Sequence, residues 1–489
     1  MSTATGISPE VLSRYETVIG LEVHVQLLTR SKIFCSCSTR FGDPANQNTC
    51  PVCLGLPGAL PVLNREAVTM AMKAALALNC TINSQSRFAR KNYFYPDLPK
   101  GYQISQYDEP LAEDGFIEIE IAGVRKRIGI TRVHLEEDAG KSLHEGFADS
   151  ATKSYIDLNR SGVPLIEIVS EPDLRSPEEA YDYLTRLKTL MLYLEVSDCN
   201  MEEGSLRVDA NISVRQKGAD RFGTKTEVKN LNSFRFLQKA LAYEAERQIG
   251  VIESGGEISQ ETRLFDSREQ RTYGMRSKEF AHDYRYFPEP DLLPVIVTTQ
   301  WKEEVIQSLP ELPWAREARF LAEYVLPKQD AALLTMSRST ADYFEQTAKA
   351  CGEPKLAANW VLNDLTFLLQ ESGKGFSDCP VSPQDLADLI KLIVKGTVSG
   401  KMAKEVLAEM FQSGKTASQV MAEKGVEQIS DPDKIAAVAR EVIAANPKQT
   451  EQYRQGKTAT LGWFVGQVMK ATRGQANPQL VQEILKKEL

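Results

Sequence analysis

Residues 19–27 read IGLEVHVQL, and this stretch decides the fold class because apolar and polar side chains alternate along it. Glycine or a polar residue separates each pair of apolar residues, which are Ile19, Leu21, Val23, Val25 and Leu27. A period of two residues is typical of a strand with one buried face and one polar face. The same alternation recurs in residues 116–121 and 206–214. The N-terminal part of the chain is therefore predicted to contain a sheet that is buried on one side.

Helices are predicted between these strands. Ser176-Pro177-Glu178-Glu179 is a capping box with proline at the first helical position, and apolar residues follow it at helical spacing. A second helix is predicted from Ser233 to about Ile249. Strands outnumber helices in this part, and polar turns separate several of them. We therefore predict an α+β fold with an antiparallel sheet, rather than alternating βαβ units.

The pattern changes near residue 295. Pro288, Pro290 and Pro294 interrupt the chain there, and from about Trp301 the periodicity is helical except for a break at residues 373–383. A chain of 489 residues also exceeds the roughly 250–300 residues beyond which a single core stops growing. We predict three domains: an α+β domain over residues 1–295, an all-α domain over 296–405 and a helical tail domain over 406–489.

Composition excludes several protein classes. The net charge is −8, with 42% hydrophobic and 25% charged residues, which is ordinary for a folded protein and excludes bulk disorder and collagen. No stretch approaches the roughly 18 apolar residues of a membrane helix, and the first residues lack a signal-peptide or import pattern. We therefore expect a cytoplasmic protein without a membrane partner. Residues 401–489 carry more Lys and Arg than Asp and Glu, unlike the acidic remainder.

Four cysteines are clustered in residues 35–53. Cys35 and Cys37 form one close pair, and Cys50 and Cys53 form a second pair after a twelve-residue gap. Two such pairs can supply four thiolates to one tetrahedral zinc ion, which would be structural because no coordination position stays open. The alternative is two pairs of free thiols.

Carboxylates gather on the polar faces of the predicted strands. Glu22 and His24 share one face of the first strand, and residues 134–138 (HLEED) place three carboxylates beside a histidine. Asp209 and Asn211 share the polar face of a later strand. Such a sheet would present an acidic floor, whose oxygen ligands suit Mg²⁺ bound together with a nucleotide phosphate. The alternative for each cluster is a solvated turn.

Other motifs are weaker. Three Gly-Lys-Ser/Thr triplets, at residues 140–142, 414–416 and 456–458, lack the glycine that a P-loop has five residues earlier. Residues 87–102 interleave basic and aromatic side chains, a pattern that can stack unpaired bases or simply pack beneath a loop. No nucleophile motif is evident.

The sequence resembles the B subunits of the glutamine-dependent aspartyl/glutamyl-tRNA amidotransferases nearly from end to end. The motifs are long and specific. They are IGLEVHVQL (19–27), KNYFYPDLPKGYQISQYD (91–108), HLEEDAGKS (134–142), DLNRSGVPLIEIVSEPD (157–173), MEEGSLRVDANISV (201–214), EVKNLNSF (227–234), DYRYFPEPDL (283–292) and LGWFVGQVMKATRGQANP (461–478).

The resemblance implies a fold and a reaction. The domain over residues 1–295 would be a catalytic cradle resembling the glutamine synthetase fold, with the zinc loop at 35–53. Using ATP, it would phosphorylate the side-chain carboxylate of a mischarged Glu-tRNA(Gln) and/or Asp-tRNA(Asn). Ammonia from an amidase-type A subunit would then displace the phosphate, and a small C subunit would complete the heterotrimer. Residues 406–489 would contact the tRNA.

The resemblance also implies site residues. Mg²⁺ would bind Glu22, His24 and Glu137, with Glu136, Asp209 and Glu227 as further candidates. Phosphates would contact Lys141, Arg160 and Lys229. Zn²⁺ would bind Cys35, Cys37, Cys50 and Cys53.

Two other functions fit the residues alone. One is an ATP-dependent carboxylate–amine ligase that acts on a small molecule without RNA. The other is a non-catalytic tRNA-binding adapter, in which the carboxylates are inert.

Overall fold

The computed structural model describes residues 7–144, 146–275, 284–424, 431–472 and 476–489. Asp283 and residues 473–475, which belong to two of the motifs quoted above, lie outside the described residues. The chain divides into two compact units, Met1–Leu312 and Pro313–Leu489. The division into three domains at residues 295 and 405 stays a prediction.

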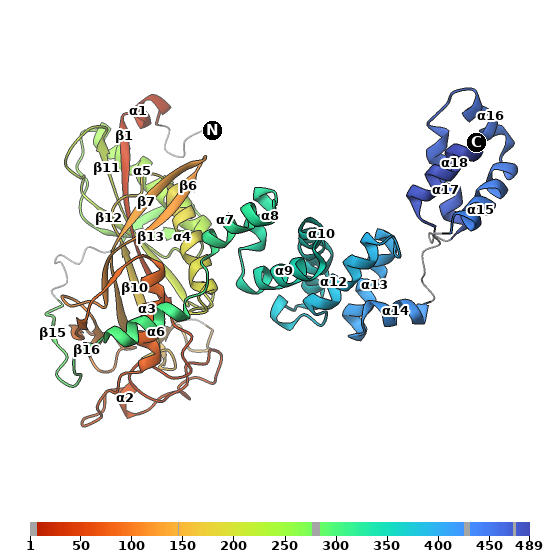
Figure 1. The fold of residues 1–489 in the computed structure, drawn as a ribbon. Coiled ribbons are helices and arrows are strands. Elements are labelled where there is room, and N and C mark those ends of the chain that lie inside the picture. The colour runs from red at the N-terminus through yellow and green to blue at the C-terminus, as the bar shows by residue number, and fades with distance from the viewer. Residues whose placement is uncertain (1–6, 145, 276–283, 425–430, 473–475) are drawn as a thin grey trace. The chain divides into compact units, whose positions relative to one another are not determined.

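A nine-stranded sheet forms the centre of the first unit (Figure 1). Its order is β14-β13-β12-β11-β1-β10-β7-β6-β2, so the first strand of the chain lies in the middle. The strands are β1 (Tyr15–Gln26), β2 (Thr81–Ile82), β6 (Ala112–Ile121), β7 (Val124–Glu137), β10 (Pro164–Ser170), β11 (Leu206–Gln216), β12 (Thr226–Lys229), β13 (Thr262–Asp266) and β14 (Arg271–Gly274).

The α+β class predicted from the sequence is confirmed, with one difference in strand direction. Described neighbours in this sheet pair antiparallel, except that β12 and β13 run parallel. The 20-residue helix α5 (Phe234–Glu253) lies between these two strands in the chain. A helical crossover of this kind is the usual connection between parallel neighbours, because it returns the chain to its original direction.

Helices cover the apolar face of the sheet. Helix α4 (Pro177–Tyr193) packs on β6, and α5 packs on β11. Both begin where the sequence predicts: the hydroxyl of Ser176 accepts a hydrogen bond from the Glu179 amide, and that of Ser233 accepts one from the Phe236 amide. The apolar side chains of β1, including Leu21 and Val23, are buried, which leaves the other face for polar residues.

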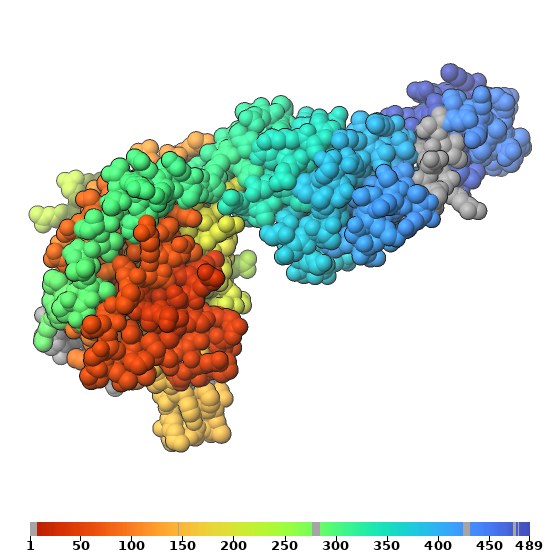
Figure 2. Space-filling view, turned by 60° about the horizontal axis from the view of Figure 1, so that its bottom comes forward, coloured from red at the N-terminus to blue at the C-terminus, as the bar shows by residue number. Residues whose placement is uncertain are grey.

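Shorter elements complete the first unit. Helix α3 (Arg65–Ala77) packs against α6 (Thr299–Ser308), as Figure 2 shows on one face of the unit. There the Arg65 guanidinium lies 4.4 Å from the centre of the Trp301 ring. The remaining elements are α1 (Pro9–Ser13), α2 (Pro51–Leu54) and three small sheets: β3 (Gln85–Ser86) with β16 (Val295–Ile296); β4 (Ala89–Asn92) with β5 (Tyr102–Ser105) and β15 (Phe287–Pro288); and β8 (Lys141–Leu143) with β9 (Tyr155–Asp157).

The second unit is helical where it is described. One apolar core runs from Phe320 to Met421, and a second runs from Ile435 to Leu485. Gly373, in the left-handed region at φ 67°, ends α11 at the predicted break. The helices are α7 (Pro313–Glu323), α8 (Lys328–Leu334), α9 (Arg338–Cys351), α10 (Pro354–Asn359), the π-helix η1 (Trp360–Leu365), α11 (Thr366–Ser372), the 3₁₀ helix η2 (Phe376–Asp378), α12 (Pro383–Val394), α13 (Gly400–Ser413), α14 (Ala417–Lys424), α15 (Pro432–Ala445), α16 (Pro447–Arg454), α17 (Thr460–Ala471) and α18 (Pro478–Glu488).

No helix within the described ranges is both long and apolar enough to cross a membrane.

Candidate active site and metal centre

The polar face of the large sheet brings together residues from four strands. In the strand register, His24 of β1 lies opposite Glu167 of β10 and opposite Arg207 of β11. Glu167 in turn lies opposite His134 of β7. Directly opposed residues in antiparallel strands have Cβ atoms about 4.5–5.5 Å apart, so these side chains form a continuous row across the sheet.

Two residues of this row and Glu136 beside it form a group that fits a cation. His24 Nε2 lies 3.5 Å from Glu136 Oε1 and 3.4 Å from Glu167 Oε2. One ligand atom from each of the three residues lies within 4.8 Å of the others. His134 Nε2 approaches the same Glu167 oxygen at 3.3 Å. Two carboxylates and an imidazole at these distances suit one divalent ion.

The surroundings of His24 and Glu167 favour the charged form of both side chains. Burial lowers the pKa of His24, but the hydrogen bond and the charge of Glu167 outweigh it and raise the pKa to about 9. Burial raises the pKa of Glu167, but His134 and His24 outweigh it and hold the pKa well below its usual value. Glu167 and His24 are therefore both charged, and the His24 ring must lose its proton before it can bind a metal ion.

A second row extends the acidic floor toward the edge of the sheet. Glu22 lies opposite Asp209, and the Asn211 amide donates to Glu22 Oε1 at 3.0 Å. Burial raises the pKa of Glu22, and the charges of Glu167, Glu227 and Asp209 raise it further. The Lys229 ammonium lies 2.9 Å from Asp209 and 3.1 Å from Glu227. Asp209 and Glu227 therefore already share a cation from the chain.

Glu137 lies apart from the group around His24. Its carboxylate accepts hydrogen bonds from the Lys100 ammonium and, at 2.9 Å, from the Ile104 amide. Adjacent residues on a strand point to opposite faces, so Glu136 and Glu137 are presented to different surroundings. Lys100 and Glu137 are both nearly inaccessible to solvent, which makes theirs a buried ion pair.

The three residues that are predicted to contact phosphate lie in different parts of the first unit. Lys229 belongs to the acidic floor, as described above. The Arg160 guanidinium donates to the carbonyls of Ala139 at 3.0 Å and Gly140 at 2.7 Å. Lys141 lies on the small strand β8, outside the large sheet.

The four clustered cysteines converge on one point. Cys53 Sγ lies 3.6 Å from Cys35, 3.7 Å from Cys50 and 3.9 Å from Cys37. Four sulfurs at about 2.3 Å from a tetrahedral zinc ion would stand roughly 3.8 Å apart. The donor set and its spacing therefore fit a tetrahedral metal ion.

A buried lysine, Lys32, contacts this cysteine cluster. The Lys32 ammonium donates to the Asn48 carbonyl at 2.7 Å, to the Leu158 carbonyl at 3.3 Å and to Cys53 Sγ at 3.4 Å. The hydrogen bond from Cys35 and the charge of Lys32 lower the pKa of Cys53 to about 4, against the effect of burial. A thiolate is the form that binds a metal.

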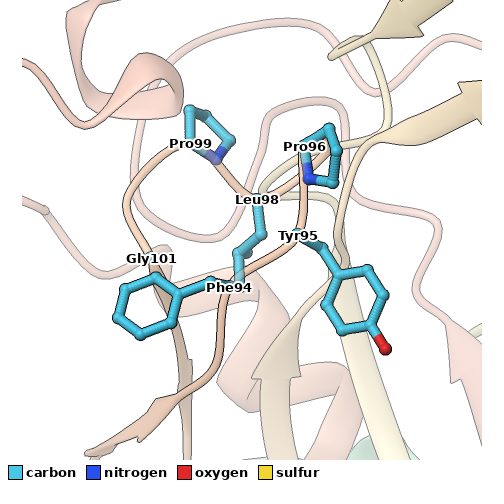
Figure 3. A pocket seen from close by; sticks show the side chains of 6 residues that line it. All are labelled: Phe94, Tyr95, Pro96, Leu98, Pro99 and Gly101. Atoms are coloured by element: carbon cyan, nitrogen blue, oxygen red, sulfur yellow. The ribbon is translucent and has the colours of Figure 1, made fainter. Parts of the chain in front are cut away.

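The loop after β4 forms a hollow of about 420 Å³ on the surface, lined by Phe94, Tyr95, Pro96, Leu98, Pro99 and Gly101. Figure 3 shows the Phe94 ring beside Gly101 and the Tyr95 ring pointing the other way. Both rings are more than half exposed, whereas the neighbouring Lys100 is held by Glu137. The exposed part of this loop is therefore aromatic rather than basic.

Comparison with protein families supplies the deciding observation. Residues 17–303 match the family model described as the GatB/GatE catalytic domain, and residues 342–489 match the model described as the GatB domain. The first match covers the large sheet and both candidate centres. The chain belongs to the GatB/GatE family.

Individual members of this family are similar over nearly the whole chain. A protein of Carboxydothermus hydrogenoformans is 57% identical over 478 residues, which are 98% of this chain and 99% of the relative. A protein of Thermoanaerobacter pseudethanolicus is 57% identical over 476 residues, and one of Geotalea uraniireducens is 56% identical over 476 residues; each match covers 97% of this chain and 99% of the relative. All three are named as the B subunit of an aspartyl/glutamyl-tRNA(Asn/Gln) amidotransferase.

The structure of this GatB/GatE family member brings into the site residues that were not among the predicted ligands. Glu167 completes the group with His24 and Glu136, and His134 contacts Glu167. Burial lowers the pKa of Lys91, but Glu136 and other nearby groups outweigh it and raise the pKa. Alternation along β10 and β7 shows that these residues face the polar side, but only the register between strands shows which of them meet.

Proposed function

We propose that this chain is the ATP-using subunit of a tRNA-dependent amidotransferase. It activates the side-chain carboxylate of Glu-tRNA(Gln) and/or Asp-tRNA(Asn) as an acyl phosphate, and ammonia then converts it to the amide. An amidase-type A subunit supplies the ammonia and a small C subunit completes the heterotrimer, in the cytoplasm. The observation that carries the proposal is 57% identity over 98% of the chain to a protein named for this activity.

The polar face of the sheet suits the first step. A carboxylate must approach a polyanionic phosphate, so catalysis depends on positioning and on neutralising charge. We propose that His24, Glu136 and Glu167 hold the metal, with Glu22 and Asp209 as further carboxylates on the same face; a metal contact of Glu137 stays a prediction. Mg²⁺, when bound, supplies the positive charge that the phosphates need. Lys141, Arg160 and Lys229 are the proposed phosphate contacts, and the four cysteines are the proposed zinc ligands.

The test uses the chain assembled with its A and C subunits. Ammonium chloride replaces glutamine, and ADP release is followed with and without Glu-tRNA(Gln). We expect ADP only when the charged tRNA is present, because its carboxylate is the phosphoryl acceptor. Equal ADP release without tRNA would instead identify a small-molecule ligase. No ADP under any condition, with tRNA still bound, would identify an adapter.

The tail domain gives a separate prediction. Lys470 is exposed on α17, and we propose that the tail contacts the tRNA backbone. Lys470→Glu is expected to weaken tRNA binding and to lower the slope of log affinity against log salt by about one, because one phosphate contact is lost. The matched control is Lys391→Glu on α12, also in the helical unit but outside the tail. An unchanged slope in Lys470→Glu would contradict a tRNA contact at this position.

A further inference from the structure

Arg132 lies on the polar face of the sheet, near the acidic floor. It lies on β7 two residues before His134, and the apolar side chains of Val133 and Leu135 are fully buried on the opposite face. In the register it lies opposite Val169 of β10, which in turn lies opposite Glu22 of β1. Arg132 and Glu22 are therefore two strands apart, or roughly 10 Å, on the same face.

The guanidinium of Arg132 has no protein partner in the described ranges. Its Nε is buried and makes no hydrogen bond there. The acidic residue opposite it on β6, Glu113, instead accepts a hydrogen bond from the Asn83 amide at 3.1 Å. A buried donor without a partner is unfavourable by about 1–3 kcal/mol, so a ligand that accepts a hydrogen bond from Nε would be favoured at this position.

Three other cations near this site are held by groups of the chain. Lys229 binds Asp209 and Glu227, and Arg207 forms a two-pronged ion pair with Asp138 at 2.9 and 3.0 Å. Arg160 donates to two backbone carbonyls. These three cations are bound to the chain itself, whereas the buried Nε donor of Arg132 has no hydrogen-bond partner in the described part of the chain.

A hollow of about 310 Å³ lies over the neighbouring strands. Glu22, Val169, Asn211 and Lys225 are among the residues that line it, and Arg132 is not. Val169 is the direct cross-strand neighbour of Arg132, so Arg132 starts one strand away from the hollow. An arginine fork matches two phosphate oxygens at once, which a lysine does not.

We propose that Arg132 binds the phosphoryl group during its transfer from ATP; this rests on the proposed function. In that step an oxygen of the acceptor carboxylate forms a bond to the γ-phosphorus. The bond between that phosphorus and the βγ-bridging oxygen breaks, and ADP leaves with the electron pair. No proton is transferred. Arg132 stabilises the charge on the transferring oxygens, which is greatest in the transition state.

The test compares two ligands of the assembled heterotrimer by calorimetry, without tRNA. One is MgADP, and the other is MgADP with aluminium fluoride, which occupies the place of the transferring phosphoryl group. Arg132→Met is expected to weaken the aluminium fluoride complex by about 10- to 100-fold and MgADP by less than about threefold. Arg127→Met, on the same strand but with its guanidinium 3.8 Å from the Phe116 ring, is the matched control.

Each outcome decides the question. Equal weakening of both ligands, or no weakening of either, would overturn the assignment. If Arg132→Met does not assemble, Arg132→Lys replaces it, with an expected selective loss of about tenfold because one charge is kept and the fork is lost. A lysine variant that binds both ligands like the wild type would also overturn it. Failure of the proposed function appears separately, as tRNA-independent ADP release by the wild type.

Discussion

Glu136→Gln is expected to reduce tRNA-dependent ADP release on the order of 100-fold or more and to raise the Mg²⁺ concentration needed for half-maximal rate. Glu136 is nearly fully buried, lies 3.5 Å from His24, and shares a candidate cation site with Glu167. Glutamine keeps the shape of the side chain but removes the charge that a divalent ion needs. The measurement is initial rate against Mg²⁺ concentration for the heterotrimer, with ammonium chloride and saturating Glu-tRNA(Gln).

Two further variants test whether the effect of Glu136→Gln is specific to that carboxylate. Glu118→Gln changes a half-exposed carboxylate on β6 and is expected to behave like the wild type. Glu137→Gln removes one partner of the buried pair with Lys100, so it is expected to lower the free energy of unfolding by about 3–5 kcal/mol. Its Mg²⁺ dependence tests whether this carboxylate also reaches the metal. A Glu136→Gln enzyme with the wild-type rate and Mg²⁺ dependence would exclude Glu136 as a ligand.

Cys53→Ser is expected to abolish zinc binding and to destabilise the loop over residues 35–53. Cys53 is the buried member of the cluster, and its sulfur is within 3.9 Å of the other three. Binding of a structural zinc ion in small domains is worth about 10–16 kcal/mol, so loss of one of four thiolates leaves little affinity. The measurements are zinc content per chain after dialysis and the thermal unfolding midpoint, each with and without a chelator.

Cys351→Ser is the matched control, because Cys351 is a partly exposed cysteine of the second unit, outside the cluster. It is expected to keep one zinc ion per chain. Chelator should lower the unfolding midpoint of the wild type and of Cys351→Ser, but not that of Cys53→Ser, which has no ion to lose. A wild-type chain without bound zinc would show that the cysteines are free thiols, and a Cys53→Ser chain that retained zinc in full would show that Cys53 is not a ligand.

Local features of the fold were accessible from the sequence. Alternation over residues 19–27 predicts β1, and the serines at 176 and 233 mark the starts of α4 and α5 to the residue. Strand alternation and helix capping depend on residues a few positions apart in the chain, and the sequence shows these residues directly. The parallel pairing of β12 and β13 was missed because strand direction at a sheet edge depends on where a long connection returns.

The composition of the site required the strand register. Glu22, His24 and Glu136 were among the predicted residues, but Glu167 and Arg132 come to the same face only because β10 lies between β1 and β7. Glu136 and Glu137 are adjacent in the sequence, yet one meets His24 and the other meets Lys100. Carboxylate-rich sequence therefore predicted the chemistry of the floor, and only tertiary structure assigned individual side chains to it.

The position of β1 at the centre of the sheet has a consequence for biosynthesis. β1 ends at Gln26, but its partners β10 and β11 end at Ser170 and Gln216. At about 5–20 residues per second, a ribosome needs roughly 10–40 s to make the intervening chain. During that time both edges of an apolar strand lack their native partners, a state that favours wrong pairing with other nascent chains. The charge of Glu22 and the polar ring of His24 oppose such pairing, so two side chains of the proposed site also protect the chain while it is being made.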